Sequence, residues 1–167
     1  VHLAAIVGDP ACAAQPDEAT EINYDATVNL YELAKSKKVK RFIFISTCSN
    51  YGKMSSEQEY VTEESKLAPV SLYASLKVKA EKYILDEKNK INTTIPTILR
   101  FATAYGISPR PRFDLTVNEF VREISLDRNL VVFGEQFWRP YCHVEDLARS
   151  AIVVLEAEKE KVDCNVY

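Results

Sequence analysis

Apolar and polar positions in the first part of the chain follow two different periods. Residues 1–7 and 41–46 are short apolar runs of strand length, and the second is rich in β-branched and aromatic side chains. Between them, from residue 16 to residue 34, apolar residues return every three or four positions, as on one face of a helix. A run that is apolar on both faces fits a central parallel strand with cover on each side. The pattern therefore predicts a strand, a helix and a buried strand in that order.

The rest of the chain continues this alternation. Its apolar spacing predicts, in chain order, a helix over residues 72–88, a strand over 93–101, a helix over 115–126, a short strand over 130–133, a helix over 144–156 and a strand at 165–167. Pro96 is the one feature against the strand that contains it, because proline cannot donate to a ladder. Alternating strands and helices are typical of a doubly wound parallel sheet, so the predicted fold class is α/β.

Composition and charge exclude several classes of function. Hydrophobic residues make up 47% of the 167 residues and charged residues 27%, which is typical of a soluble globular protein. The net charge of −3 provides no basic surface, so we expect no nucleic-acid partner. No apolar run has the length of a membrane span and no secretory leader opens the chain, so we expect a cytoplasmic protein that binds no membrane.

The four cysteines are widely spaced, and no two of them form a C-x-x-C pair. This spacing argues against a zinc site and against a disulfide framework, so we expect reduced thiols and no metal. The two histidines, His2 and His143, lie beside a predicted strand and at the start of a predicted helix, where we expect structural roles for both.

Tyr73 and Lys77 are the first candidates for chemistry. They are four residues apart, so in the predicted helix both side chains project from the same face, one turn apart. A neighbouring ammonium favours the phenolate and lowers the pKa of a phenol from its usual value of about 10, which would make Tyr73 a proton-transfer group. A helical tyrosine is more often a packing residue and such a lysine is more often solvated, so the pair alone is a weak signal.

Hydroxyl groups at the end of the predicted strand 41–46 strengthen this signal. Ser46 and Thr47 lie at the carboxyl edge of the sheet, where open α/β sheets bind their ligands. A hydroxyl at a strand end, a loop of roughly twenty residues and a Tyr/Lys helix together form a far more specific pattern than the pair alone.

Short stretches along nearly the whole chain carry a resemblance to a known family. They are His2-Leu-Ala-Ala5, Asn23, Arg41-Phe-Ile-Phe-Ile-Ser-Thr47, Tyr51-Gly52, Tyr73-x-x-x-Lys77, Leu99-Arg100, Tyr105-Gly106 and Arg139-Pro-Tyr-Cys-His-Val-Glu-Asp146. With these stretches in this order, the chain resembles the extended short-chain dehydrogenase/reductase family. Within that family it is similar to the NAD-dependent sugar-nucleotide epimerases and dehydratases, in particular those of the UDP-glucose 4-epimerase type.

The resemblance implies a role for each matching residue. Thr47 would hydrogen-bond the reacting sugar hydroxyl, Tyr73 would act as the catalytic base, and Lys77 would hold the nicotinamide ribose and lower the pKa of Tyr73. Thr103 and Arg139 would contact the substrate together with Thr47, and the Arg139 guanidinium would reach the diphosphate. The other positions that the resemblance implies in cofactor binding are Ala4, Ala5, Asn23, Ser46, Phe101 and Ala102.

The implied activity is C4 epimerisation of a nucleotide sugar with NAD, with NADP not excluded. Dehydratases of the family carry Asp-Glu directly after the active-site Thr, where this chain has Cys48 and Ser49. Because water loss and decarboxylation need such a carboxylate, epimerisation and simple keto reduction remain. A reductase of a keto sugar or other carbonyl is the enzyme alternative, and a non-catalytic nucleotide-binding protein that kept the fold is the alternative from another class.

The family's glycine-rich dinucleotide turn is missing, because none of the four glycines clusters with another. We therefore expect the C-terminal part of a Rossmann-type sheet, preceded by two βαβ units of roughly thirty residues each, and no activity from the chain alone. Its expected parts are residues 1–105 of the NAD(P)-binding domain, 106–142 of a small substrate-binding region, and 143–167, a helix and strand returning to the sheet. Preceding residues or another chain would cover the outer edge of residues 1–7, and the resemblance implies a homodimer.

Overall fold

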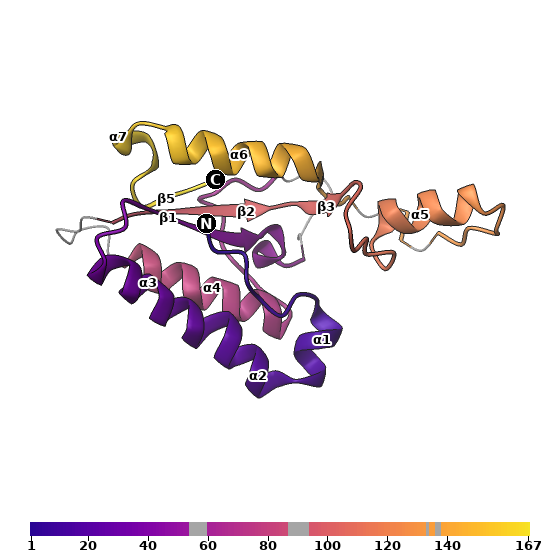
Figure 1. Ribbon diagram of the computed structural model, residues 1–167. Helices are drawn as coiled ribbons and strands as arrows, with labels where there is room; N and C mark the ends of the chain where they lie inside the picture. The colour runs from indigo at the N-terminus through magenta and orange to yellow at the C-terminus, as the bar shows by residue number, and fades with distance from the viewer. Residues whose placement is uncertain (54–59, 87–93, 133, 136–137) are drawn as a thin grey trace.

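Helices cover both faces of a parallel sheet (Figure 1). The computed structural model describes residues 1–53, 60–86, 94–132, 134–135 and 138–167. The elements in chain order are α1 (Asp9–Ala14), α2 (Pro16–Thr20), the π-helical turn η1 (Glu21–Asp25), α3 (Ala26–Ser36), β1 (Arg41–Thr47), the 3₁₀ turn η2 (Cys48–Tyr51), α4 (Leu72–Leu85), β2 (Ile95–Phe101), β3 (Thr103–Tyr105), α5 (Thr116–Ser125), β4 (Tyr141–His143), α6 (Val144–Glu156), α7 (Lys159–Val162) and β5 (Asn165–Val166).

Strand β1 has a neighbour on each of its edges, and β2 is the middle strand of the sheet β1-β2-β5. It pairs in parallel with β2 over its full length, so that Thr47 stands opposite Phe101, and β2 pairs in turn with β5. On its other side β1 receives a bridge from His2 to Phe44. Helix α4 is the crossover between the parallel strands β1 and β2. The predicted alternation of strands and helices is therefore confirmed in this part of the fold.

Two apolar clusters, one on each face of the sheet, form most of the core. The cluster beneath α3 and α4 contains Tyr31, Ala34, Phe42, Phe44, Ala80, Ile84 and Ile98. The cluster beneath α6 and α7 contains Ile43, Leu99, Val154 and Val162. Alternate residues of β1 enter opposite clusters, which explains why the sequence of this strand is apolar on both faces. Each fully buried aliphatic or aromatic side chain contributes roughly 1.5–3 kcal/mol of hydrophobic free energy.

Strand β2 contains Pro96 without being interrupted by it. Ile95 donates its backbone N–H toward β1, to Lys40, so the nitrogen of Pro96 faces the opposite side. On that side β5 begins only opposite Thr97, and the Pro96 carbonyl accepts a hydrogen bond from the Cys164 N–H at 2.8 Å. The missing N–H therefore falls just before the ladder begins, where the strand does not need it.

The strand predicted over residues 1–7 is wrong beyond its second residue. Of these seven residues, all of which the structure describes, His2 alone bridges to the sheet. The N–H and the carbonyl of Ile6 hydrogen-bond instead to the side-chain amide of Asn23, at 2.7 and 2.9 Å. The hydrogen bonds of the Asn23 side chain thus take the place of a β-ladder at Ile6, shortly before α1 begins. The sequence reasoning missed α1, although Pro10 in its first turn is a recognised helix-start signal.

The strand predicted over residues 130–133 is also wrong for the residues that the structure describes. Residues 130–132 form no ladder, and residue 133 lies outside the described part of the chain. Val131 and Val132 are 65% and 45% exposed, so they lack the packed neighbours that a strand requires. A short parallel pair between β3 and β4 was not predicted, because three residues are too few to leave an alternating pattern.

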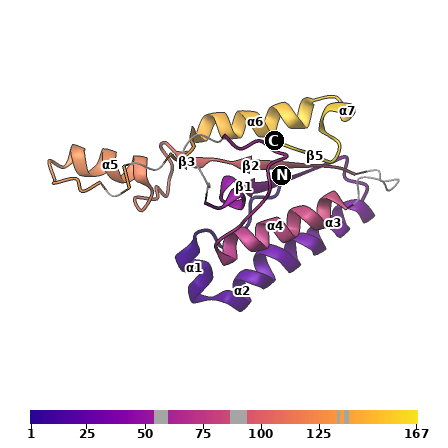
Figure 2. The same ribbon diagram turned by 180° about the vertical axis from the view of Figure 1, so that it is seen from behind.

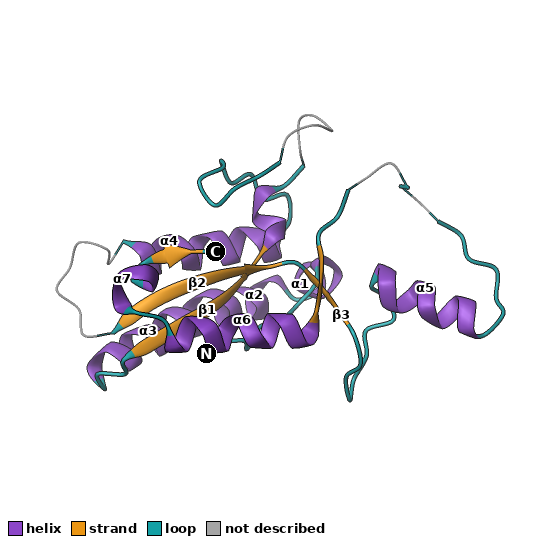
Figure 3. Cartoon of the chain, turned by 90° about the horizontal axis from the view of Figure 1, so that it is seen from above, coloured by secondary structure: helices purple, strands orange, loops and turns teal. Residues whose placement is uncertain are grey.

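Helix α5 stands away from the sheet, on the far side of β3 (Figures 1 and 2). Seen from above, α6 runs along the sheet whereas α5 is well separated from it (Figure 3). The helices predicted over 72–88, 115–126 and 144–156 are confirmed as α4, α5 and α6, although residues 87–88 lie outside the described part. None of the helices in the described residues has the length and apolar character that a bilayer crossing requires.

Candidate active site

Lys77 on α4 reaches under the carboxyl end of β1. Its ammonium donates a hydrogen bond to the carbonyl oxygen of Ile45 at 2.8 Å and lies 4.6 Å from the centre of the Phe44 ring. The centre of the Tyr73 ring is 5.9 Å away. Ser71 caps the start of the helix by accepting a hydrogen bond from the Ala74 N–H at 3.2 Å, which fixes where α4 begins. The predicted pair therefore lies against the strand end that carries the predicted hydroxyl.

Burial decides the protonation of Lys77. The side chain is 3% exposed, and this burial lowers its pKa to about 8, an effect that the charges of Glu81 and Cys12 oppose. An ammonium has three N–H donors. Within the described part of the chain, the carbonyl of Ile45 is the acceptor found for one of them. Two donors of a buried cation thus remain for other acceptors.

Thr47 ends β1 and caps η2. Its side-chain oxygen accepts a hydrogen bond from the Ser49 N–H at 3.2 Å, and the residue is 8% exposed. The next residue, Cys48, is close enough to Tyr73 for its charge to raise the pKa of the phenol. The structure therefore brings Thr47, Tyr73 and Lys77 to one end of the strand.

The pKa of Tyr73 corrects one expectation. We expected Lys77 to lower it, but burial and, to a smaller extent, the charges of Cys12, Cys48 and Asp9 together raise it to about 12. The cation that lowers this pKa is Arg112. Since the pKa of Lys77 is about 8, its ammonium has lost its proton before a phenol with a pKa near 12 ionises. Lys77 is accordingly not among the charges that lower the pKa of Tyr73 in the ligand-free protein.

Arg112 was not among the candidates from the sequence. Its guanidinium forms an ion pair with Asp114, and its backbone carbonyl accepts a hydrogen bond from the Asn118 side chain at 3.1 Å. The Asn118 oxygen in turn accepts the N–H of Gly106 at 3.4 Å, so the loop is fastened to the start of α5. Nothing in the sequence pattern distinguishes this arginine from its neighbour Arg110.

The other predicted site residues fall into two groups. Phe101, Ala102 and Thr103 follow one another at the carboxyl end of β2, and all three are half-buried. Because Phe101 stands opposite Thr47, this group lies beside the strand end just described. Arg139 is exposed, and its charge lowers the pKa of Cys48, so it belongs to the same neighbourhood.

The second group lies along the edge of β1 that faces away from β2, in and around the segment that follows His2. Asn23 is buried, and its amide binds the backbone of Ile6 on both sides while also donating to the Cys12 sulfur at 3.7 Å. Its position within η1 places it opposite this segment, and Ala4 and Ala5 immediately precede Ile6. The structure gives Asn23 a role in holding this backbone, and cofactor contacts for Ala4, Ala5 and Asn23 stay predictions.

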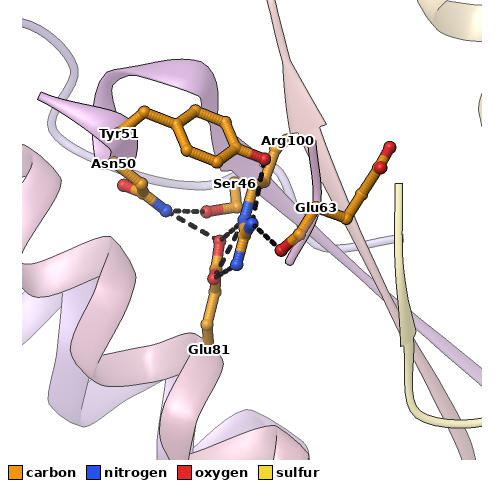
Figure 4. A network of polar contacts seen from close by, with 6 residues as sticks. All are labelled: Ser46, Asn50, Tyr51, Glu63, Glu81 and Arg100. Atoms are coloured by element: carbon orange, nitrogen blue, oxygen red, sulfur yellow. Dashed lines mark hydrogen bonds and ion pairs between the residues drawn. The ribbon is translucent and has the colours of Figure 1, made fainter. Parts of the chain in front are cut away.

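Ser46, the last predicted residue, belongs to a buried polar network (Figure 4). Its hydroxyl accepts a hydrogen bond from the Asn50 amide at 3.0 Å, and the same nitrogen donates to Glu81 at 2.7 Å. Glu81 is also bound by Arg100, whose guanidinium reaches the Tyr51 hydroxyl at 2.9 Å. The sequence analysis did not identify Asn50 or Glu81, although an acidic residue on the apolar side of a helix was a usable signal.

The sequence of this chain is similar to those of known proteins. The model of the NAD dependent epimerase/dehydratase family matches residues 1–167. A UDP-glucuronate 4-epimerase from Thermodesulfobacterium geofontis is 30% identical over 158 residues, which are 93% of this chain and 47% of that protein. A UDP-glucose 4-epimerase from Bacillus subtilis is 24% identical over 183 residues, covering 100% of this chain and 53% of that protein.

A solved structure shows the same fold. The UDP-glucuronic acid 4-epimerase from Bacillus cereus, in complex with UDP-glucuronic acid and NAD, is 30% identical with a TM-score of 0.81, over 99% of this chain and 51% of that one. The predicted Rossmann-type α/β fold is thereby confirmed, and the chain spans about half the length of the relatives that it matches. With the family model matching its whole length, this chain belongs to the NAD-dependent epimerase/dehydratase family.

Proposed function

We propose that this protein, in its full length, is an NAD-dependent 4-epimerase of a nucleotide-linked sugar, most directly a UDP-linked hexose or hexuronic acid. The observation that carries the proposal is the gathering of Thr47, Tyr73 and Lys77 at the carboxyl end of β1. The family and its 4-epimerase relatives support the reaction class.

The residues at this strand end fit a nicotinamide cofactor. Lys77 is a buried cation with two N–H donors that no described residue accepts, and such donors suit ribose hydroxyls. Tyr73, Phe101 and Ala102 would line the same space. When bound, NAD would accept a hydride from sugar C4, return it to the other face, and place a positive charge beside the phenol.

Tyr73 would exchange a proton with the C4 hydroxyl, and Thr47 would orient that hydroxyl. With a pKa of about 12, the Tyr73 phenol is protonated at neutral pH in the ligand-free protein. Lys77 is still mostly protonated at pH 7, because its pKa is about 8. A phenolate formed at that pH would therefore lie beside a cation, which is the arrangement that a tyrosine base needs.

Acid/base groups for other reactions of the family are missing. Cys48 and Ser49 follow Thr47, and neither offers the carboxylate that water loss or decarboxylation would need. Cys48 is half-buried, and burial raises the pKa of its thiol, so it does not substitute for an acid of low pKa. This supports epimerisation, with keto reduction as the enzyme alternative because it uses the same three residues.

The division of the chain into regions and its assembly belong to the same proposal. Residues 1–105 would belong to the cofactor-binding domain, 106–142 to a substrate-binding region, and 143–167 to the return to the sheet. The full-length protein would form a homodimer through α3 and α4. Leu30 and Leu33 on α3 are 40% and 52% exposed, which supports a contact on that helix. Sedimentation of the full-length protein tests this, and a monomer at all concentrations would contradict it.

The deciding experiment incubates the full-length protein with NAD and a panel of UDP-sugars, followed by NMR of the anomeric protons. We expect one pair of C4 epimers to interconvert with no net change in NADH absorbance. Tyr73→Phe should lose turnover by about 10²–10⁴-fold with its circular dichroism unchanged. Net formation of NADH, which is keto reduction run in the reverse direction, would identify a reductase, and sugar binding without turnover would identify a binding protein.

A further inference from the structure

The network of Figure 4, formed by Ser46, Asn50, Tyr51, Glu63, Glu81 and Arg100, joins β1, α4 and β2, the elements that carry Thr47, Tyr73, Lys77 and Phe101. We propose that Glu81, Arg100 and Asn50 are positioning residues, which fix α4 against the ends of β1 and β2. They thereby set where Tyr73 and Lys77 stand relative to Thr47. This inference rests on the proposed function, since it concerns the geometry of that reaction.

Each of the three residues neighbours a residue of the site along the chain. Glu81 lies on α4 one turn after Lys77, and Arg100 directly precedes Phe101 in β2. Asn50 lies in η2, three residues after Thr47. A contact among the three therefore joins the helix to both strand ends, at positions one to four residues from Phe101, Thr47 and Lys77.

Glu81 is the centre of the network. It is 1% exposed, and its two carboxylate oxygens accept the Arg100 Nε–H at 3.1 and 3.2 Å and a terminal N–H of the same guanidinium at 2.7 Å. One of them also accepts the Asn50 amide at 2.7 Å. Burying a carboxylate costs much free energy unless the group is paired and hydrogen-bonded. Moving its partners away would therefore be unfavourable.

Arg100 also connects the network to the segments that follow β1. The terminal nitrogen that does not bind Glu81 donates to the Tyr51 hydroxyl at 2.9 Å and to the backbone carbonyl of Glu63 at 3.0 Å. A guanidinium is planar and presents its donors in fixed directions. Three partner groups from three segments are therefore held around a single side chain.

Asn50 completes the link to the residue beside Thr47. Its amide nitrogen donates both to Glu81 and to the hydroxyl of Ser46, which directly precedes Thr47. Turning the amide over would direct its oxygen at the Glu81 carboxylate, so this orientation is the favourable one. That oxygen is buried without a hydrogen-bond partner in the described residues. An unpaired buried oxygen costs stability. We therefore infer that the role of Asn50 lies in the hydrogen bonds that its nitrogen donates to Glu81 and Ser46.

A positioning role and a purely stabilising role predict different effects of substitutions on the turnover rate. If the network only stabilises the fold, weakening it lowers the folded fraction and leaves the folded protein with its normal rate. If it positions the site, the folded protein itself becomes slower, because small displacements of reacting groups are costly. Substrate affinity should change little, since no member of the network is a predicted substrate contact.

The kinetic test uses Asn50→Ala and Glu81→Gln in the full-length protein. Asn50→Ala removes the link to Ser46 while leaving the ion pair intact, so it tests the proposal even where Glu81→Gln fails to fold. We expect kcat to fall about tenfold in Asn50→Ala and about a hundredfold in Glu81→Gln, each with KM within twofold of the wild type. Thr97→Val is the matched control, since it removes a buried hydrogen bond from β2 to the Val162 carbonyl, 2.7 Å long, away from the site.

A second readout needs no turnover. Backbone hydrogen exchange of the ligand-free protein should become faster in segments 45–52 and 72–81 of both variants, and should stay unchanged there in Thr97→Val. If the wild type turns over no sugar, the proposed function fails while the exchange experiment still tests the tie. A kcat within twofold of the wild type in Asn50→Ala, a loss that only follows the folded fraction, or faster exchange spread evenly along the chain would overturn the positioning role.

Discussion

The ammonium of Lys77 is held at 2.8 Å from the carbonyl oxygen of Ile45, in the interior of the protein, and only 3% of the residue is exposed. This one contact joins α4 to β1 two residues before Thr47. It also places a cation where its charged form is destabilised by burial. The contact therefore links the geometry of the candidate site to a dependence on pH.

Stability should rise with pH as Lys77 loses its proton. Burial lowers its pKa from 10.5 to about 8, so between these values the unfolded chain binds more protons at this residue than the folded one. Relative to Lys77→Met, the free energy of unfolding of the wild type should rise by up to about 3 kcal/mol between pH 8 and pH 10.5. Urea denaturation of both proteins across this window measures the difference, and parallel curves would contradict the buried charge.

Breaking the ion pair of Glu81 and Arg100 from one side should be strongly destabilising. Arg100→Met leaves a buried carboxylate without its cation and should lower the free energy of unfolding by about 3–5 kcal/mol. Adding Glu81→Leu removes that charge, so the double variant should be much closer to the wild type than the sum of the two losses. A thermodynamic cycle from urea titrations measures this coupling, and additive effects would exclude it.

Asn23→Ala should loosen the amino-terminal segment. The substitution removes both side-chain hydrogen bonds to Ile6 and leaves its backbone N–H and carbonyl without those partners. The expected loss is about 1–3 kcal/mol in the free energy of unfolding. Asn29→Ala, an exposed position on α3, is the matched control and should change stability by less than about 0.5 kcal/mol. Equal effects of the two changes would show that the contact with Ile6 is unimportant.

Gly52 should be irreplaceable for two reasons. Its φ of 73° is one that other residues rarely adopt, and an added Cβ would lie 1.9 Å from the backbone oxygen of Ala68. Gly8 has a φ of 98°, but a Cβ there would meet nothing nearer than the Arg112 side chain at 3.5 Å. Alanine should therefore cost clearly more at Gly52 than at Gly8, by about 1 kcal/mol or more in thermal or urea denaturation. A similar cost at both would show that strain alone matters.

The elements that the sequence predicted well are those with a long apolar repeat. The runs that became β1, α3, α4, β2 and α6 each bury one or two faces, and burial of a face imposes a period on the sequence. The end of the first predicted strand was missed because a single side chain, Asn23, substitutes for a ladder. A hydrogen bond across 17 positions leaves no period in the sequence.

The candidate site shows the same division. The convergence of Thr47, Tyr73 and Lys77 followed from spacing, strand ends and the family resemblance. The pKa of Tyr73 did not, because it depends on how deeply the phenol is buried and on which charges surround it. The pairing of Glu81 with Arg100 likewise needed the fold, since 19 positions separate them along the chain.

The parallel register of β1 and β2 sets Thr47 opposite Phe101 at the end of both strands. Side chains alternate between the two faces of a sheet, so one inserted or deleted residue in either strand would turn every later side chain over. Substitutions can therefore change the side chains that this edge presents while their order is kept. An insertion or deletion within either strand would instead rearrange the whole candidate site.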